Sequence, residues 1–279
     1  MSRRLVTAGG TAAVVIMCLA TVGAQEARVP GAVYDVDRPN EKPGPAPRRD
    51  IAGIWEPARG PGDAIQANGA RAMPADGNHP LPFTDAGRAA YLSHKPAFGE
   101  NMVPSALSND PVPNCDPQGF PRIVLHNFRT SQIVQTPDQV LVLYQFNKKW
   151  RAIWNDGREM PKDPEPRWWG TSVGKWVDDF TFVAQTAGVD DRTWLDNAGR
   201  PHSDAMRVVE TYYRRDADHL EMTIVIDDPK FYTKPWTALD KLSLRKQPKG
   251  FVLQEMECSP SETAAYNKRL GDPGSKGGK

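Results

Sequence analysis

The chain of 279 residues contains 35 Lys and Arg against 34 Asp and Glu, which gives a formal net charge of +1. This balance provides no electrostatic footprint for nucleic acid or for an anionic membrane surface, so we predict neither as a partner. The sequence has no glycine-rich phosphate loop and no dinucleotide-binding fingerprint, and we predict no cofactor.

The first 24 residues have the pattern of a secretory signal peptide. Arg3 and Arg4 form a basic start, residues 5–21 are apolar or small, and residues 22–24 (VGA) make a small-x-small cleavage pattern. The apolar run is too short and too rich in small residues to span a bilayer comfortably. We therefore expect cleavage, a periplasmic or secreted protein, and no transmembrane segment after cleavage.

The segments on either side of the central region are predicted to be extended or disordered. Residues 25–50 are rich in Pro, Gly and charge, and we expect a leader that is disordered or draped over the domain. Residues 51–121 are predicted to be an extended arm that wraps a barrel, with a strand candidate at 51–55 and a helix at 84–92 that begins after a Thr N-cap. Residues 261–279 are expected to be a disordered tail.

Residues 122–260 consist of short segments rich in Val, Ile, Tyr, Trp and Thr. Several alternate with a period of two, as at 206–213 and 220–226, which is typical of antiparallel strands with one buried face. The expected strands are 122–128, 132–135, 139–146, 150–154, 173–177, 180–186, 206–214, 219–227, 238–245 and 251–257. Because closure removes exposed strand edges, this pattern predicts a mostly β fold, an antiparallel up-and-down barrel.

The connections between these strands fall into two classes. Those at 147–149, 178–179, 216–218 and 246–250 are short, whereas those at 155–172, 187–205 and 228–237 are long. Successive connections of an up-and-down barrel alternate between its two ends. We therefore expect the long connections to share one end and to form a loop-bearing mouth.

Cys115 and Cys258 are the two cysteines that follow the signal peptide. The predicted topology brings them to the rim of the mouth, and an exported protein meets an oxidising compartment. A disulfide between them is the simplest interpretation, since two isolated cysteines lack the close spacing of a zinc site.

Three long motifs resemble a family of exported bacterial proteins of unassigned function. They are NCDPQGFPR at 114–122, WLDNAGRPHSD at 194–204 and DPKFYTKPW at 228–236, together with the shorter DGR at 156–158. The resemblance covers about residues 110–260 and brings no activity with it. Gly53-Ile54-Trp55 is similar to the first-strand signature of lipocalin-type barrels, which implies a lipocalin-like or calycin-like fold.

His202 is the candidate catalytic base of the mouth, because imidazole exchanges protons near neutral pH. Asp204 or Asp196 would orient its ring, and Tyr232 or an arginine would stabilise developing negative charge. The alternative is that His202 holds its own loop through hydrogen bonds to the backbone.

Large aromatic and cationic side chains accompany this histidine. The candidate ligand-binding residues are Trp168, Trp169, Trp194, Trp236, Arg158 and Arg200. They would form an aromatic wall with cationic partners for a small molecule; alternatively, the aromatic rings plug the barrel and hold the long loops to it. The carboxylates Asp190, Asp191, Asp196, Asp227 and Asp228 could bind calcium, but they lack a calcium-loop spacing, and we predict no metal.

Our leading hypothesis is a protein that acts on a small organic molecule at the mouth, by cofactor-free acid/base chemistry such as isomerisation, elimination or hydration. The alternatives are a non-catalytic periplasmic binding or carrier protein and an envelope interaction protein. An enzyme requires His202 beside a carboxylate and open to a cavity. A carrier requires an apolar cavity without that pair, and an interaction protein requires a filled barrel with an exposed aromatic patch.

Overall fold

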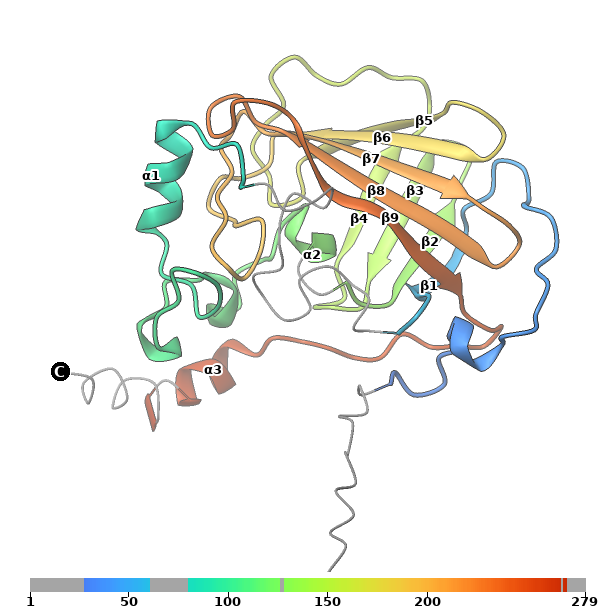
Figure 1. Ribbon diagram of the computed structural model, residues 1–279, viewed down its shortest axis with the longest axis horizontal. Coiled ribbons are helices and arrows are strands. Elements are labelled where there is room, and N and C mark those ends of the chain that lie inside the picture. Colours follow the sequence, from blue (N-terminus) through green and yellow to red (C-terminus); the bar gives the residue numbers. More distant parts are fainter. Residues whose placement is uncertain (1–27, 61–79, 126–127, 267, 270–279) are drawn as a thin grey trace, which may run out of the picture.

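The computed structural model describes residues 28–60, 80–125, 128–266 and 268–269, so the predicted signal peptide lies outside the described residues. Nine strands form a closed barrel (Figure 1). The strands are β1 Gly53–Pro57, β2 Ser131–Gln135, β3 Gln139–Tyr144, β4 Trp150–Trp154, β5 Thr171–Trp176, β6 Thr181–Ala187, β7 Arg207–Arg214, β8 His219–Asp227 and β9 Trp236–Lys246. The helices are α1 Asp85–Ser93, α2 Arg122–Leu125 and α3 Pro260–Tyr266, with 3-10 turns at Asp35–Asp37, Ser105–Leu107 and Val112–Asn114.

The alternation of buried and more exposed side chains along the strands explains why the sheet closes into a barrel. In β7 and β8 every second residue is buried, and inward residues such as Val208 and Ile226 face each other across the two strands. An apolar inner face on each strand gives one shared core, which is what closes the sheet. The predicted mostly β barrel is confirmed.

The strand directions differ from the prediction at one point. All neighbouring strands are antiparallel except β4 and β5, which are parallel and meet at Trp154 and Val173. Residues 155–170 must therefore run from one end of the barrel to the other. We call the end that carries residues 188–206 and 228–235 the loop end. The short 145–149 turn also lies there, so the expected separation of short and long connections is wrong.

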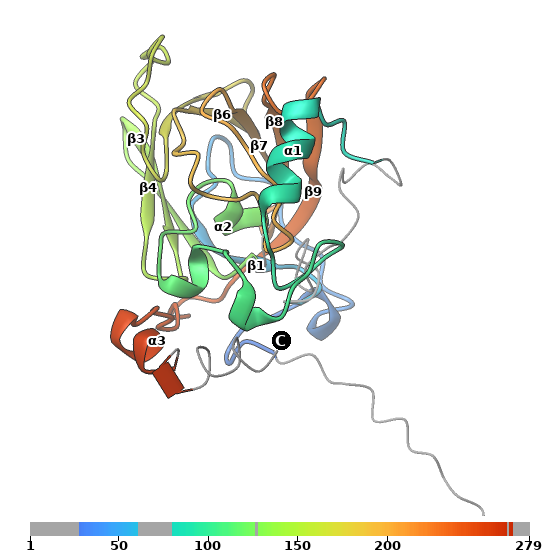
Figure 2. The ribbon, with the colours of Figure 1, turned by 90° about the vertical axis from the view of Figure 1, so that its left-hand side faces the viewer.

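Two predicted strands lie outside the barrel wall. Residues 122–125 form α2, which lies between β3 and β4 on one side and β8 and β9 on the other (Figure 2). Its side chains are buried in the core cluster. Residues 251–257 run across the outside of the barrel, with one bridge from Met256 to Phe146. β1, which we had assigned to the arm, closes the barrel by pairing with β2 and β9 instead.

The segments before and after the barrel pack against it. Tyr34 is buried, and Asp35 accepts hydrogen bonds from His219 and Arg245, so residues 28–50 follow the draped alternative rather than the disordered one. α3 occupies the start of the predicted disordered tail. Residues 80–121 cross the loop end, and α1 is capped by Thr84, whose hydroxyl accepts from the amide of Gly87.

The predicted disulfide is confirmed. Cys115 and Cys258 are bonded, with their Cα atoms 5.4 Å apart. It forms beside the 145–149 turn, because Asn147 Oδ1 accepts from the amide of Cys258 at 2.7 Å. In the part of the chain that is described, no helix is long and apolar enough to cross a membrane.

Candidate functional site

His202 lies at the loop end, inside the protein. Its side chain is 2% exposed; Nε2 is 2.6 Å from the hydroxyl of Thr193 and Nδ1 is 3.2 Å from the carbonyl oxygen of Ser203. Burial lowers the pKa of His202, which favours the neutral ring. A neutral ring protonated on Nδ1 can donate to Ser203 and accept from Thr193 at Nε2, in which case the single hydroxyl proton of Thr193 is not donated to the carbonyl oxygen of Asp190, 3.1 Å away.

The two carboxylates expected to orient His202 have other partners. Asp196 is fully buried, pairs with the guanidinium of Arg200 and accepts the amide of Ala198 at 2.8 Å. Asp204 is exposed and pairs with Lys230. The catalytic pair we expected is therefore not assembled in this structure, and the contacts of His202 correspond to the alternative in which it holds its own loop.

Asp228 joins two loops of the loop end without contacting His202. Its two oxygens accept the amide and the hydroxyl of Ser203, each at 2.6 Å. These bonds join the 188–206 connection to the 228–235 connection. We had placed Asp228 in a possible calcium cluster, but no group of three His, Cys, Asp or Glu side chains in the described residues is arranged to hold a metal.

The predicted aromatic wall is mostly packed into the loop end. Trp194 is 4% exposed and stacks on His94 with ring centroids 4.4 Å apart. Tyr232 is buried against Trp236 and donates its hydroxyl to the carbonyl oxygen of Pro201 at 2.7 Å. These rings follow the alternative in which aromatics plug the barrel and hold the loops.

The remaining predicted residues are less enclosed or lie elsewhere. Trp169 stacks on Tyr144. The guanidinium carbon of Arg192 lies over the ring of Trp168, 4.3 Å from the ring centroid. Arg158 belongs to the connection that runs outside the barrel, where it covers Trp154 and pairs with Asp156. The structure thus brings together His202, Asp196, Arg200, Tyr232, Trp194 and Trp236, and separates Arg158 and Asp204 from them.

A charged pair inside the barrel was missed from the sequence. Arg151 Nη2 donates to both carboxylate oxygens of Glu210 at 2.8 Å, and Tyr212 donates its hydroxyl to the same carboxylate at 2.6 Å. The Arg151 guanidinium lies over the ring of Phe120, 3.8 Å from its centroid. The alternation of inward and outward residues could have revealed this pair. Arg151 is two residues from the inward-facing Ile153 on β4, and Glu210 is two residues from the inward-facing Val208 on β7.

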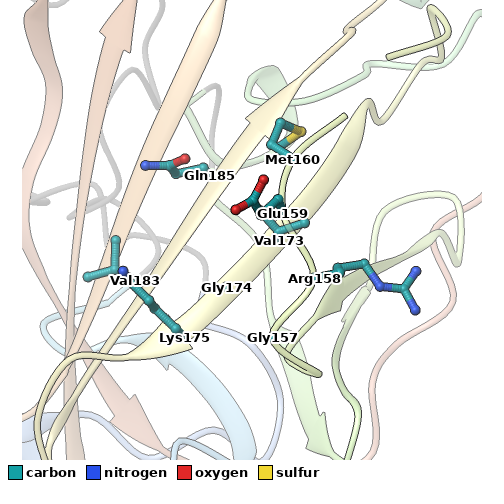
Figure 3. Close-up of a pocket in the computed structure, with 9 residues that line it drawn as sticks. All are labelled: Gly157, Arg158, Glu159, Met160, Val173, Gly174, Lys175, Val183 and Gln185. Atoms are coloured by element: carbon teal, nitrogen blue, oxygen red, sulfur yellow. The ribbon is translucent and has the colours of Figure 1, made fainter. Parts of the chain in front are cut away.

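One groove lies on the outer wall between residues 157–160 and strands β5 and β6. It has a volume of about 320 Å³. Met160 and Val183 line it together with Glu159, Lys175 and Gln185, whereas the Arg158 guanidinium points away from these side chains (Figure 3). The lining mixes both charge signs at a small site, so it defines no single class of ligand.

A larger groove, about 490 Å³ in volume, lies on the outer wall of β1 to β4. Its floor is a row of side chains at matched positions on four adjacent strands, namely Ile54, Gln132, Leu143 and Trp150. Its other wall is formed by residues 251–254 of the segment that crosses the outside of the barrel. We call residues 248–258 the strap. Trp150 is 62% exposed although it faces this groove.

The ends of the strap are fixed to the barrel, and its middle spans the larger groove. Before the strap, the amide of Gln247 donates to the carbonyl oxygen of Ile54 at 2.7 Å. At its end, the amide of Asn147 donates to the carbonyl oxygen of Met256 at 2.6 Å, and Cys258 is held by the disulfide. In between, the amide of Gln254 reaches Gln145 Oε1 at 3.2 Å.

Comparison with known proteins gives no match to a family model, to a curated protein or to a solved structure.

Proposed function

We propose that this protein is a non-catalytic binding protein, and that the groove beneath the strap holds a small amphipathic anion. The observation that carries the proposal is the groove itself. Its volume of about 490 Å³ lies in the range of roughly 300–1,000 Å³ that small-molecule sites occupy. It combines an apolar lining with an exposed indole, Trp150.

The lining suggests the chemistry of the ligand. Ile54, Leu143, Phe251 and Leu253 provide apolar surface for a hydrocarbon or aromatic body. Among the described residues that line the groove there are two lysines, Lys148 and Lys149, and no carboxylate. Both lysines belong to the 145–149 turn, so we expect the anionic group of the ligand to bind at that side of the groove.

One existing contact would compete with this ligand. Lys148 Nζ lies 3.3 Å from a carboxylate oxygen of Glu255 on the strap, and both side chains are largely exposed. Exposed ion pairs contribute little to stability. A carboxylate or sulfonate on the ligand can therefore replace Glu255 at small cost.

The loop end gives less support to acid/base catalysis. A general base needs the proton that it abstracts within reach, and His202 is enclosed by Thr193 and Ser203. The outer groove has the open, partly apolar character of a binding site. The binding alternative is therefore better supported than the enzyme alternative.

The proposal is tested by titrating the protein with the fluorescent probe anilinonaphthalene sulfonate. Dodecanoate is then added as a competitor to displace the probe. We expect Trp150→Ala to weaken probe binding about ten-fold, because a large aromatic contact is lost. Trp154→Ala is the matched control, since Trp154 lies on the same strand and is covered by Arg158 instead of lining the groove. Equal probe affinity in the wild type and Trp150→Ala would rule out this groove as the site.

The charge of the ligand is tested separately. The double variant Lys148→Gln/Lys149→Gln should weaken dodecanoate competition and leave dodecanol competition unchanged, because only dodecanoate carries a charge. An equal loss of affinity for dodecanoate and dodecanol would show that the lysines do not bind the anionic head group.

A further inference from the structure

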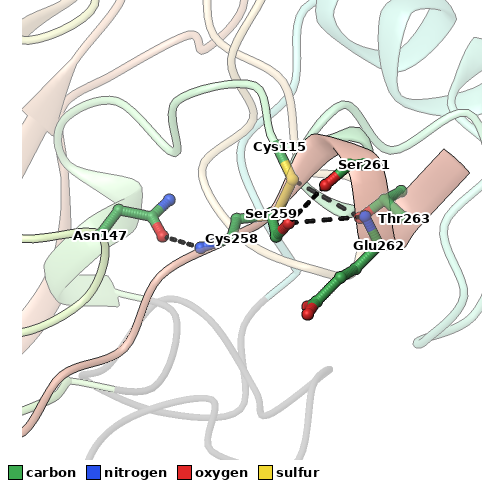
Figure 4. The surroundings of a disulfide bond; sticks show 7 residues. All are labelled: Cys115, Asn147, Cys258, Ser259, Ser261, Glu262 and Thr263. Atoms are coloured by element: carbon green, nitrogen blue, oxygen red, sulfur yellow. Dashed lines mark hydrogen bonds between the residues drawn. A yellow bond between two sulfur atoms is a disulfide. The ribbon is translucent and has the colours of Figure 1, made fainter.

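The disulfide joins the strap to a rigid part of the arm. Cys115 follows the 3-10 turn Val112–Asn114 and is half-buried beside α3, where its sulfur lies 3.5 Å from the hydroxyl of Thr263 (Figure 4). Five residues earlier, Asp110 accepts two hydrogen bonds from the Arg122 guanidinium, at 2.9 and 2.7 Å. Both of these side chains are buried. The arm therefore offers a fixed anchor for Cys258.

Without the disulfide, the end of the strap would depend on weaker contacts. Figure 4 shows Asn147 bonded to the amide of Cys258 at one side of the bridge. The amide of Asn147 also donates to Met256, and Gln145 Nε2 contacts the sulfur of Met256 at 3.1 Å. These contacts all come from the 145–149 turn. At this end, a single short turn would then hold the wall that carries Phe251 and Leu253.

We propose that the Cys115–Cys258 disulfide is a redox latch on the groove, an inference that rests on the proposed binding function. In the oxidised protein the strap is held against the barrel and the groove has two walls. A dithiol reductant opens the latch by thiol–disulfide exchange. Its thiolate attacks one sulfur of the bridge, the protein S–S bond breaks, and a mixed disulfide forms. The second thiol of the reductant then resolves this intermediate, which leaves two protein thiols and one oxidised reductant.

Reducing the disulfide lowers the affinity for ligand because the strap gains conformational freedom. A bound ligand would have to order Phe251 and Leu253, whose conformations the oxidised protein has already restricted. The floor of the groove is unaffected, since Ile54, Leu143 and Trp150 belong to barrel strands. Reduction should therefore weaken binding and speed ligand release without abolishing the site.

The test compares oxidised protein with protein reduced by dithiothreitol. Affinity for anilinonaphthalene sulfonate is measured by fluorescence, and the barrel is followed by far-ultraviolet circular dichroism. We expect binding to weaken about ten-fold on reduction, with an unchanged dichroism spectrum. Hydrogen exchange of residues 251–257 should become faster, whereas exchange in β7 and β8 should not. The Cys115→Ser/Cys258→Ser variant should behave as the reduced protein and should not respond to dithiothreitol.

Each other outcome is decisive. Equal affinity in oxidised and reduced protein, with the spectrum unchanged, would overturn the latch and leave the binding function standing. Unfolding of the barrel on reduction would assign the disulfide to global stability and overturn the latch. Failure of the oxidised protein to bind probe, dodecanoate or dodecanol would overturn the binding function itself. In that case, a change in hydrogen exchange confined to residues 251–257 would show that the strap moves on reduction and would say nothing about ligand binding.

Discussion

Asp228 is the residue on which the loop end depends most directly. It receives the amide and hydroxyl of Ser203 in a fully buried position. In Asp228→Asn one carboxylate oxygen becomes an NH2 group, which cannot accept either proton. Buried hydrogen bonds to a charged group are worth roughly 1.5–3 kcal/mol each. We expect the variant to lose about 2 kcal/mol of unfolding free energy in urea titrations.

Asp204→Asn is the control for Asp228→Asn, because it removes a carboxylate from the same loop end but from an exposed ion pair with Lys230. Its unfolding midpoint should stay close to that of the wild type, since exposed pairs contribute little. A larger loss in Asp204→Asn than in Asp228→Asn would contradict the assignment of roles.

Glu56 makes stability depend on pH. Burial raises the pKa of Glu56 to about 7 from an ordinary value of 4.5, and a hydrogen bond from Thr130 only partly opposes this. Between these values the folded protein holds a proton that the unfolded chain has released. Stability therefore falls as pH rises from 4.5 to 7, by about 3 kcal/mol from this group.

Glu56→Gln should remove that loss, because the amide is neutral at every pH and can still accept from Thr130. We expect the variant to exceed the wild type in unfolding free energy at pH 8, with the difference shrinking towards pH 5. Burial lowers the pKa values of His94 and His202, which acts in the opposite direction and equally in both proteins. The difference between them therefore isolates Glu56, and a constant difference across this range would refute the prediction.

At the scale of elements, Asp35 is one of the residues that hold the N-terminal segment to the barrel. Asp35 accepts from His219 Nε2 at 2.9 Å and from Arg245 Nη1 at 3.0 Å. Burial opposes ionisation of Asp35, but these bonds outweigh it and lower its pKa. Asp35→Asn should loosen residues 33–41 and speed cleavage after Glu41 by a glutamate-specific protease. Asp240→Asn, on an exposed position of β9, is the control and should leave the cleavage rate unchanged. Equal rates in both variants would show that the segment is held elsewhere.

Elements were predictable where burial alternates along the chain. β7 and β8 show this pattern clearly, and the sequence therefore predicts them well. Ile123, Val124 and Leu125 are all buried in the core, and a short continuous apolar run does not distinguish a buried helical turn from a strand. The strap looks like a strand for another reason, since its apolar residues face a groove on the outer wall.

The candidate site was predictable in position and not in role. The spacing of the long loops correctly grouped His202, Asp196 and Tyr232 at one end. Whether a histidine there is open or buried depends on how distant segments pack, here the arm that brings His94 against Trp194. The strap groove depends on a contact between β1 and residues almost two hundred positions later in the chain. No local pattern encodes such a contact.

For the whole molecule, the disulfide encloses every barrel strand except β1, with a sequence separation of 143 residues. Closing so long a loop restricts the unfolded chain far more than the folded one, and such bonds contribute typically about 2–4 kcal/mol. We expect Cys115→Ser/Cys258→Ser to lose about this much unfolding free energy in urea titrations. Because β2 to β9 fold within the loop, the loss should be present without ligand, and it should grow by about 1.4 kcal/mol at saturating ligand, since ten-fold weaker binding stabilises the folded variant less. A loss that appears only when ligand is present would mean that the bond acts through the groove alone.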